Sequence, residues 1–506
     1  LGGSFGRGAM TNHFNDMANS DVMVIVGGNP AENHPATLRH IMKAREHGAE
    51  FIVIDPRFTK SAAVADKYYP LRSGSDIALF GAIVNYLLQN NLINEEYVKS
   101  YTNATWLVSP AYGFKDGMFT GWTEKDGKFS YDVTQWSYQV ESTTTWDTTP
   151  TGPFAWTQAP GVPKFTLPQG SVVKKDLTLQ DPQCVFQLMK KHYERYTPQM
   201  VEDIVGMTKE QFEELAKSIG STYTDDRVAT FMYAMGLTQH TVGSQNIRAL
   251  SIIQLLLGNM GIAGGGINAL RGEGNVQGST DWALLYNNIP GYLNAPSSAK
   301  HPTFTDYLSV ETPAASYSTN RPKFFVSYLK EFYGENATLE NDFCYDLHPK
   351  IDTKDYSFMP MFESMNEGEM KGLFCWGQNP ALGGPNGNFT RQAISKLDWM
   401  VCTDLMETDT AGFWHLPITA GEDAPDPKTI DTEVFLLPAC SHIEKEGTVS
   451  NSGRWVQWRY RAIKPLFDSK DDGEIMTLLF HELQELYKAE GGTFPDPILK
   501  TTWNYL

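Results

Sequence analysis

The hydrophobic pattern along the chain predicts parallel strands that alternate with helices. Residues 22–26 form a continuous apolar and β-branched run, which is typical of a strand buried on both faces. A helix is expected from Pro35 to about Gly48, and residues 51–54 form a second buried strand that ends at Asp55. This strand–helix–strand unit, with a glycine turn after its first strand, predicts an α/β fold that binds ligands at the carboxyl ends of its strands.

A second strand–helix–strand unit has the same layout. Strand 373–376 is followed by a glycine turn, a helix over residues 389–397 and strand 400–403, which ends at Asp404. Both turns contain Asn-Pro, and the acidic residue follows that asparagine by 26 positions in the first unit and 25 in the second. We therefore predict an internal repeat of a nucleotide-binding half. Turn amides and a helix N-terminus would bind pyrophosphate, and the carboxylate would accept hydrogen bonds from ribose or guanine.

The repeat predicts a pair of doubly wound, Rossmann-like domains, over residues 1–275 and 276–506. Two regions, residues 101–180 and 285–360, are rich in aromatic residues, proline or glycine and lack helical periodicity. We interpret both as irregular excursions with short strands.

A third strand, over residues 228–234, leads into a turn that places Gln239 and His240 at a strand's carboxyl end. The segment "INALRGEGNVQGSTDW", residues 267–282, follows further along the chain. It is too rich in glycine for an ordinary helix, so we predict a loop. The loop either lies on the solvated surface or brings its backbone close to a polar ligand, with Arg271 directed at an anion.

The composition of the chain excludes several classes of function. The chain has 506 residues, 20% of them charged, with a net charge of −18, which argues against general binding to nucleic acid or anionic membranes. The five cysteines are scattered without CxxC spacing, so no iron–sulfur or zinc motif is present in this chain. No apolar run is long enough for a transmembrane helix, and no signal peptide is visible.

Several motifs together resemble a known family. They are "SFGRGAMTNHFND", "GGNPAENHP", "IDPRFT", "RSGSDIA", "MYAMGLTQHTVG", "ALRGEGNVQGSTD" and "EKEGTVSNSGRWVQW". With them the chain resembles the large (alpha) subunits of respiratory formate dehydrogenases, within the dimethyl-sulfoxide-reductase-like molybdopterin oxidoreductases. The resemblance implies oxidation of formate to carbon dioxide at molybdenum or tungsten, held by two pyranopterin guanine dinucleotides.

The resemblance also implies which residues bind the dinucleotides. Those for the first are Gly27, Gly28, Asn29, Glu32, Asp55, Arg57, Thr59, Gly74 and Asp76, and those for the second are Gly377, Gln378, Asn379, Asp404 and Thr408. Three further cofactor-binding residues lie in the turn after strand 228–234: Met235, Gly236 and Gln239.

The catalytic residue implied by the resemblance is Arg271, whose guanidinium would anchor the carboxylate of formate. Gln239 would lie near the substrate or pterin, although it could belong to an ordinary turn. His240 would act as a proton or orientation group. Thr280 would line the substrate channel, or else cap a helix.

The remaining implications concern parts outside the chain. The resemblance places the metal ligand, selenocysteine or cysteine followed by histidine, upstream of Leu1, together with the cysteines of a [4Fe–4S] cluster, and a barrel domain after Leu506. Electrons would pass to an iron–sulfur (beta) subunit and then to a membrane cytochrome b subunit or a cytochrome c, in anaerobic respiration in the periplasm. Two alternatives stay open: a nitrate or other oxyanion reductase with an aspartate or serine metal ligand, and an inactive cofactor-binding fragment.

Overall fold

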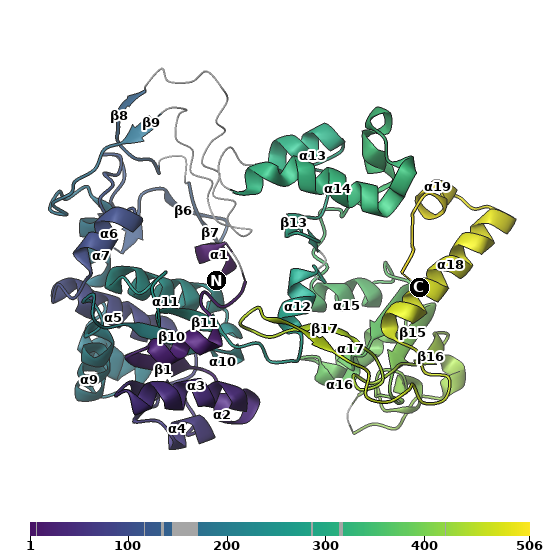
Figure 1. Cartoon of the computed structure of the whole chain (residues 1–506), viewed down its shortest axis with the longest axis horizontal. Coiled ribbons are helices and arrows are strands. Elements are labelled where there is room, and N and C mark those ends of the chain that lie inside the picture. Colours follow the sequence, from purple (N-terminus) through teal and green to yellow (C-terminus); the bar gives the residue numbers. More distant parts are fainter. Residues whose placement is uncertain are drawn as a thin grey trace. The chain divides into compact units, whose positions relative to one another are not determined.

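The computed structural model describes residues 1–6, 8–115, 117–132, 136–143, 171–284, 287–312, 317–419 and 421–505. These residues form two compact units. The first contains Leu1–Gly278 and Ser450–Val456, and the second contains Ser279–Thr312, Tyr317–Val449 and Gln457–Leu506. Each unit contains a parallel sheet with helices packed against it, which confirms the α/β fold class (Figure 1).

The first unit is built on a parallel sheet of five strands. The strand order is β11 (Gly266–Ala269), β10 (Ala229–Tyr233), β1 (Val22–Val26), β2 (Glu50–Ile54) and β3 (Lys67–Tyr69). All four pairings are parallel, so the carboxyl ends of the strands share one edge. The sequence predicts β1, β2 and β10, whereas β3 and β11 are short edge strands that it does not reveal.

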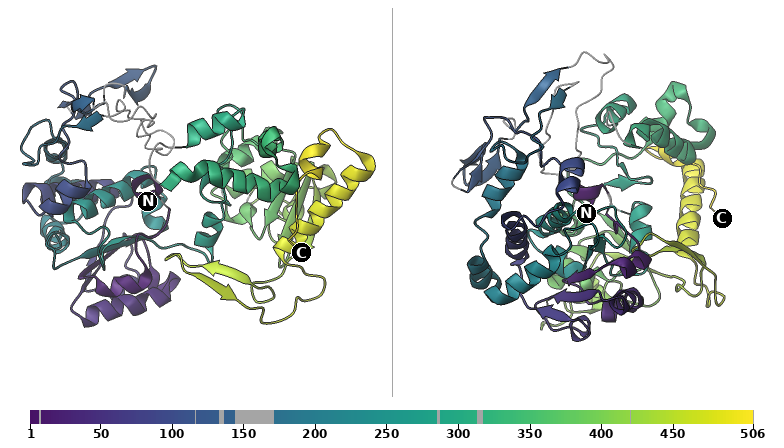
Figure 2. Two further views of the ribbon diagram at one scale, coloured as in Figure 1. Left: turned by 45° about the horizontal axis from the view of Figure 1, so that its top comes forward. Right: turned by 60° about the vertical axis from the view of Figure 1, so that its left-hand side comes forward.

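Helices cover both faces of this sheet. Val22, Val24 and Val26 of β1 join one core with α5 (Asp76–Gln89), α9 (Lys209–Gly220) and α11 (Gly243–Leu257). Met23 and Ile25 join a second core with α3 (Pro35–Glu46) on the opposite face. This alternation explains the continuous apolar run, because a central strand must be apolar on both sides. Figure 2 shows the purple and teal helices on opposite sides of the sheet.

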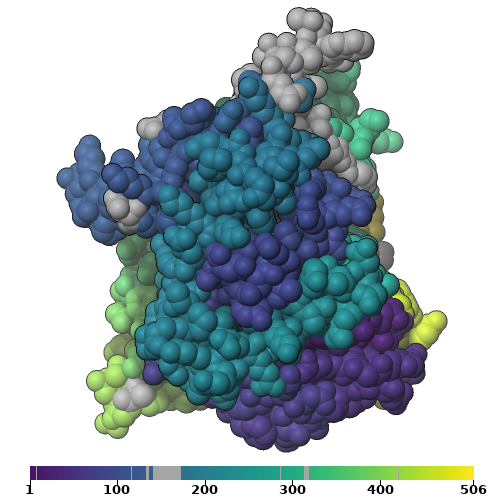
Figure 3. Space-filling model, turned by 90° about the vertical axis from the view of Figure 1, so that its left-hand side faces the viewer, coloured from purple at the N-terminus to yellow at the C-terminus, as the bar shows by residue number. Residues whose placement is uncertain are grey.

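Segments that are far apart in the sequence lie side by side in this unit. Helix α5 packs against α11 in the same core, and Figure 3 shows indigo residues of the first hundred directly beside teal residues from beyond position 200. The smaller elements of this unit are α1 (Gly2–Phe5), η1 (Phe14–Asn19), α2 (Pro30–Asn33), α4 (Lys60–Ala63), α6 (Glu95–Tyr101), α7 (Val185–Tyr193), α8 (Pro198–Met200), η3 (Val201–Val205) and α10 (Met235–Thr238).

The insertion at 101–180 contains the short strands that the sequence predicts. They form three antiparallel pairs: β4 (Phe114–Lys115) with β5 (Met118–Phe119), β6 (Trp122–Lys125) with β7 (Lys128–Tyr131), and β8 (Val140–Thr143) with β9 (Ser171–Val173). The part of the insertion over 144–170 lies outside the described residues.

The second unit contains a parallel sheet in the order β14 (Gly372–Trp376), β15 (Trp399–Asp404) and β16 (Glu433–Pro438). Helices α15 (Phe358–Asn366), α16 (Pro380–Gly383) and α17 (Gly387–Ile394) accompany it. The predicted strands and helix are present, with the helix displaced toward its N-terminus. The other elements after β14 are η7 (Phe413–His415), η8 (Pro427–Thr429), β17 (Gly447–Ser450), β18 (Val456–Arg459), α18 (Asp472–Glu490) and α19 (Pro495–Leu499).

The expectation of an irregular excursion over 285–360 was wrong. Residues there form α13 (Phe304–Glu311), α14 (Arg321–Tyr333) and the helical segment η6 (Leu339–Leu347), around an aromatic core of their own. Helix α14 buries Phe325, Leu329 and Tyr333, spaced by four residues, which is a helical signal that the many aromatic residues obscured. The minor elements here are α12 (Val276–Asp281), β12 (Asn288–Ile289), β13 (Leu293–Asn294), η4 (Tyr317–Asn320) and η5 (Gly334–Asn336).

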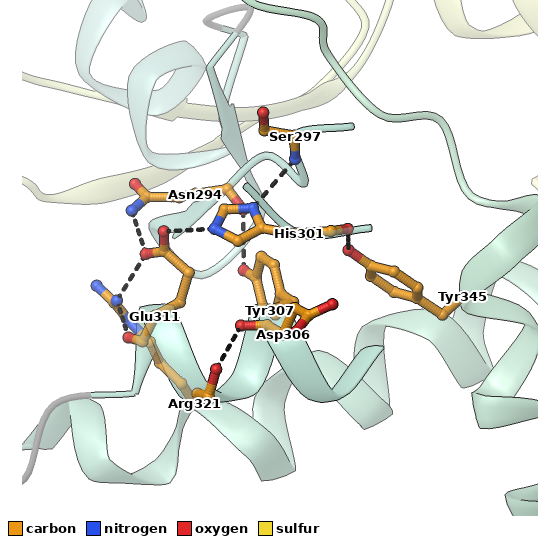
Figure 4. A network of polar contacts seen from close by, with 9 residues as sticks. Asn294, Ser297, His301, Asp306, Tyr307, Glu311, Arg321 and Tyr345 are labelled. Atoms are coloured by element: carbon orange, nitrogen blue, oxygen red, sulfur yellow. Dashed lines mark hydrogen bonds and ion pairs between the residues drawn. The ribbon is translucent and has the colours of Figure 1, made fainter. Parts of the chain in front are cut away.

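A buried polar network joins the helices of this excursion (Figure 4). Glu311 at the end of α13 is 3.2 Å from His301 Nε2 and 3.2 Å from Arg321 Nη1, and it accepts a hydrogen bond from Asn294. The Tyr307 hydroxyl donates to the Asn294 carbonyl at 2.9 Å. Because the members partner one another, the network holds α13 and α14 together.

Among the described residues, no helix is long and apolar enough to cross a membrane.

Candidate functional site

The turn after β1 requires glycine. Gly27 has φ +58°, and its amide donates to the carbonyl of Ile54 at 3.2 Å. A Cβ on Gly27 would lie 2.6 Å from the backbone of Gly236 and Leu237, and the Gly236 amide donates to the Gly27 carbonyl at 3.0 Å. The turns after β1 and β10 therefore pack backbone to backbone, which only glycine permits.

The side chain of Asn29 holds the first turn in place. Its Oδ1 accepts hydrogen bonds from the Ser61 amide at 3.2 Å and from the Ser61 hydroxyl at 2.8 Å. The Ser61 hydroxyl in turn accepts from the Ala31 amide at 3.0 Å. The Asn29 Nδ2 donates to Glu32. The turn after β1 is thus clamped to α4, the short helix that follows β2.

Ionisable side chains gather at the same edge of the sheet. Asp55 follows β2, and Asp76 is the first residue of α5, with its carboxylate 3.7 Å from His240 Nε2. Burial raises the pKa of both carboxyls, and the neighbouring Asp55 raises the pKa of Asp76 further, while His240 opposes the rise. His240 Nε2 also donates to the Gly236 carbonyl at 2.8 Å. Asp55, Asp76 and His240, all three predicted site residues, are therefore brought together by the fold.

Two basic residues, Arg57 and Lys60, and the helix-capping residue Thr59 follow Asp55 in the chain. Arg57 is exposed and donates its amide to Asp55 at 2.9 Å, and Lys60 Nζ is 3.0 Å from Glu32. The hydroxyl of Thr59 caps α4 by accepting from the Ala62 amide at 3.2 Å.

Among the other predicted residues of the first site, Gly74, Met235 and Gln239 are exposed and Gly28 is buried. Gly74 precedes α5 with φ +84°, and nothing lies within 4 Å of its Cβ direction. Met235 and Gln239 are both exposed, at the beginning and the C-cap of α10. Gly28 is buried beneath the turn, against Ala234.

Arg271 leaves β11 at the same sheet edge and is held at several atoms. Its Nε donates to Gln277 Oε1 at 3.3 Å, and its Nη2 donates to the carbonyl of Gly8. Its amide donates to the Ser452 hydroxyl at 2.9 Å, and its carbonyl accepts from His34 Nε2. Among the described residues, Nη1 has no hydrogen-bond partner, so part of the guanidinium can take an anion.

The expectation that 267–282 is a loop was wrong in part. Its beginning pairs as β11 with β10, and its end forms α12, because strand pairing and a helical turn satisfy backbone groups that a loop would expose. Gly272 and Gly274 between them have open space at their Cβ positions. Gly278 is needed for packing, since a Cβ there would lie 2.0 Å from Asn275 Oδ1.

Thr280 lies in α12 and belongs to the second unit, whereas Arg271 belongs to the first.

The second turn repeats the glycine conformation and the hydrogen bonds of the asparagine oxygen, whereas Asn379 Nδ2 donates to Asp409 Oδ2 at 2.8 Å. Gly377 also has φ +58°, and its amide donates to the Thr403 carbonyl at 2.9 Å. Asn379 Oδ1 accepts from the Thr410 amide at 3.0 Å and the Thr410 hydroxyl at 2.9 Å. That hydroxyl accepts from the Ala381 amide at 3.0 Å. The internal repeat inferred from the two Asn-Pro turns is therefore confirmed.

The surroundings of the second turn differ from those of the first. Nothing lies within 4 Å of the Cβ direction of Gly377, and β14 is an edge strand of its sheet. The neighbouring Gln378 is exposed, and Asp404 accepts from the Leu405 amide at 2.7 Å. The Thr408 hydroxyl accepts from the Ala411 amide at 3.5 Å.

Sequence reasoning missed the residues that support these sites. Ser61 and Thr410 hold the two turns, and a signal for them exists, because each hydroxyl follows its Asn-Pro asparagine by about the same distance, 32 and 31 positions. Ser452 and His34 hold the Arg271 backbone from 181 and 237 positions away. No local pattern reveals such contacts.

A family model described as molybdopterin oxidoreductase matches residues 2–420. The chain belongs to the molybdopterin oxidoreductase family. The family implies a molybdopterin cofactor that carries molybdenum or tungsten.

Similar proteins carry formate dehydrogenase names. The chain is 44% identical to "Formate dehydrogenase, nitrate-inducible, major subunit" of Escherichia coli (strain K12), over 100% of this chain and 47% of that protein. It is also 44% identical to "Formate dehydrogenase 2 subunit alpha (cytochrome c-553)" of Nitratidesulfovibrio vulgaris, over 99% of this chain and 47% of that protein. The chain thus spans about half the length of the curated relatives it matches.

A solved structure shares the fold. The acetylene hydratase of Pelobacter acetylenicus superposes with a TM-score of 0.50 at 16% sequence identity, over 96% of this chain and 50% of that one.

The residues present fit a cofactor with nucleotide arms. Each unit has a glycine turn in a left-handed conformation, followed by a short helix and faced by a carboxylate at the next strand's end. At Gly377 the Cβ direction is open, so a ligand can approach the backbone closely. The described residues hold no group of three or more histidine, cysteine or acidic side chains placed to bind a metal ion.

Proposed function

We propose that the protein containing this chain oxidises formate to carbon dioxide. The observation that supports this proposal most directly is the geometry of Arg271. Its guanidinium is held by Gln277 and Gly8, and Nη1 stays available for an anion at the carboxyl edge of the sheet. The similarity of nearly the whole of this chain to about half of each protein named formate dehydrogenase supports formate as the substrate.

The cofactor in this proposal has two pyranopterin guanine dinucleotides, one for each matched turn. Asp55, Asp76 and the Gly27 turn would hold one dinucleotide, and Asp404 and the Gly377 turn the other. A bound metal of this kind accepts two electrons from a substrate. The turn amides and the helix N-termini suit the diphosphates, and the carboxylates suit guanine or ribose donors.

Arg271 would bind the carboxylate of formate through charge-assisted hydrogen bonds. A guanidinium is always protonated and presents parallel donors to a planar anion, so it orients the substrate as well as binding it. Because Gln277 is fully buried, its contact with Nε fixes the plane of the group. In this proposal Gln239 and His240 orient groups at the same edge, and Thr280 lines the substrate channel.

Electrons would leave the site through iron–sulfur clusters to a separate redox protein. One similar chain carries cytochrome c-553 in its name, which supports a cytochrome as a downstream acceptor. An iron–sulfur subunit and a periplasmic location belong to the same proposal and would be tested by co-purification and by cell fractionation.

The test uses the full-length protein loaded with cofactor. Formate-dependent reduction of a viologen dye and release of labelled carbon dioxide from labelled formate are expected, and Arg271→Ala is expected to lower kcat/KM by about 100-fold or more. Arg271→Lys keeps the charge and loses the parallel donors, so it should recover only part of the activity. Reduction of nitrate in place of formate oxidation would overturn the proposal, and absence of bound metal and nucleotide would point to an inactive fragment.

A further inference from the structure

The backbone of Arg271 is held on both sides by side chains from distant parts of the first unit. Its amide donates to the Ser452 hydroxyl at 2.9 Å, and its carbonyl accepts from the ring of His34. Arg271 comes directly after Leu270, whose amide still bonds to Tyr233 of β10. Beyond this point the strand pairing ends. The side chains of Ser452 and His34 then supply the hydrogen bonds that fix the backbone of Arg271.

The segment that carries Ser452 is itself firmly attached. Residues Ser450–Val456 return to the first unit from late in the chain, although the sequence places them in the second domain. The Ser450 amide donates to Asn275 Oδ1 at 2.9 Å, four residues after Arg271. Trp455 stacks on the ring of His13 with 3.8 Å between ring centroids. The segment is anchored at both ends, and Ser452, only 7% exposed, lies between the anchors.

His34 connects Arg271 to the first nucleotide turn. It follows directly after α2, the short helix that begins at Pro30 in the Gly27 turn. Its ring therefore joins the turn to the carbonyl of Arg271.

We propose that Ser452 and His34 are positioning residues that aim the guanidinium of Arg271 at the substrate anion. This inference rests on the proposed role of Arg271 in binding formate. A long side chain transmits any shift of its Cα to its charged end. Hydrogen bonds at both the amide and the carbonyl keep the peptide groups on either side of Arg271 from rotating. A displacement of about 1 Å at a substrate-positioning group is enough to lower a rate strongly.

The first experiment compares Ser452→Ala with Ser450→Ala in the loaded, full-length protein. Ser450 is a matched control because it bonds through its backbone amide, which alanine keeps. For Ser452→Ala we expect the KM for formate and the inhibition constant of nitrate, used as a planar monoanion, to rise together by about tenfold. Ser450→Ala should change neither. Ser452→Thr, which restores a hydroxyl, should recover most of the loss.

A merely structural role for Ser452 predicts a different outcome. Metal content, guanine nucleotide content and kcat would then fall together, while KM and the nitrate constant would stay the same. That pattern, or equal behaviour of Ser452→Ala and Ser450→Ala, overturns the inference.

The second experiment tests His34 with His34→Phe and His34→Gln. Phenylalanine keeps a ring and removes the donor, whereas glutamine keeps an N–H donor. We expect His34→Phe to raise the KM and the nitrate constant several-fold and His34→Gln to raise them less. Equal constants in both variants and the unmodified protein would exclude His34 from the positioning role.

The failure of the proposed function can be told apart from the failure of this inference. If Arg271→Ala keeps the unmodified KM and nitrate constant, Arg271 does not bind the anion and the proposed function loses its carrying residue. If Arg271→Ala loses anion binding while Ser452→Ala and His34→Phe keep it, only the positioning role is wrong.

Discussion

The turn after β1 and the turn after β14 have the same backbone but different charged residues at matching positions. Both begin with glycine at φ +58° and are clamped by an asparagine to a hydroxyl residue after the next strand. The first turn is faced by Arg57 and Lys60, whereas Met406 and Asp409 occupy the matching positions of the second. Glu407 adds a further carboxylate there.

The comparison shows which features the two turns share. Both have the clamp and the glycine that shape the turn amides, whereas the charged residues around the turns differ. The proposed function accounts for this, because backbone amides bind a phosphate without side-chain charge. The packing also differs, because β1 is central and the turn after β10 covers Gly27, whereas β14 is an edge strand and Gly377 is open.

Removing the clamp should have the largest effect, and an equal one in both units. Asn29→Ala and Asn379→Ala each delete an acceptor of two hydrogen bonds and a donor, a loss of about 3 kcal/mol. Hydrogen exchange of the Ser61 and Thr410 amides, which bond to these side chains, should accelerate by about 100-fold each. Asn29→Asp and Asn379→Asp keep the acceptor but set a carboxylate against Glu32 and Asp409, so the exchange of both amides should accelerate in these variants too. Acceleration in only one unit would mean that the clamps are not equivalent.

Replacing the first glycine of each turn by alanine should lower the free energy of unfolding by different amounts in the two turns. Gly27→Ala combines a left-handed backbone with a Cβ 2.6 Å from Gly236, and we expect a loss of about 2–3 kcal/mol. Gly377→Ala has the same φ and open space, so a loss of about 1 kcal/mol is expected. Unfolding in denaturant measures the free energy of unfolding of both variants. A loss at Gly377 as large as the loss at Gly27 would contradict the difference in packing.

Neutralising the charged residues around each turn, which we call the rim charges (Arg57 and Lys60, and Glu407 and Asp409), should change nucleotide affinity in opposite directions at the two sites. Arg57→Met with Lys60→Gln should weaken binding of GDP to the cofactor-free protein by about tenfold at low salt. Glu407→Gln with Asp409→Asn removes two carboxylate charges, keeps their acceptors, and should strengthen GDP binding at the second site. Calorimetry at two salt concentrations gives both constants, and the differences should shrink at high salt. A change in the same direction for both pairs would show that rim charge does not distinguish the sites.

The smallest effect concerns the buried carboxyl of Asp76. Burial raises its pKa above the ordinary value, so the folded state binds this proton more tightly and loses stability as pH rises from about 4. Asp76→Asn removes that loss, and the cofactor-free variant should melt about 1–3 °C higher than the unmodified protein near pH 7. The gain should vanish toward pH 4. Asp126→Asn, in the exposed turn between β6 and β7, is the control and should show no such pH dependence.

The sequence predicts the elements whose signals are local. The strands β1, β2, β14 and β15 coincide with apolar runs in the sequence, and Pro35 marks a helix start, so their positions follow from neighbouring residues alone. Only β1 and β2 are almost entirely buried. The helix α14 escaped detection although Phe325, Leu329 and Tyr333 are buried at helical spacing. Further aromatic residues outside the buried face, such as Phe324 and Phe332, obscure that periodicity in the sequence.

For the candidate site, the sequence by itself determined the repeated Asn-Pro turns, the carboxylates at the matched strand ends and the glycines around Arg271, because each depends on spacing along a single segment. Only the tertiary structure decided that Asp76 lies beside His240, that Ser61 and Thr410 clamp the turns, and that Ser452 and His34 hold Arg271. These contacts join positions from about 30 to more than 200 residues apart. Which residues meet in these contacts depends on the order of the strands in the sheet and on where a distant segment packs. A local pattern of residues determines neither the strand order nor the packing of that segment.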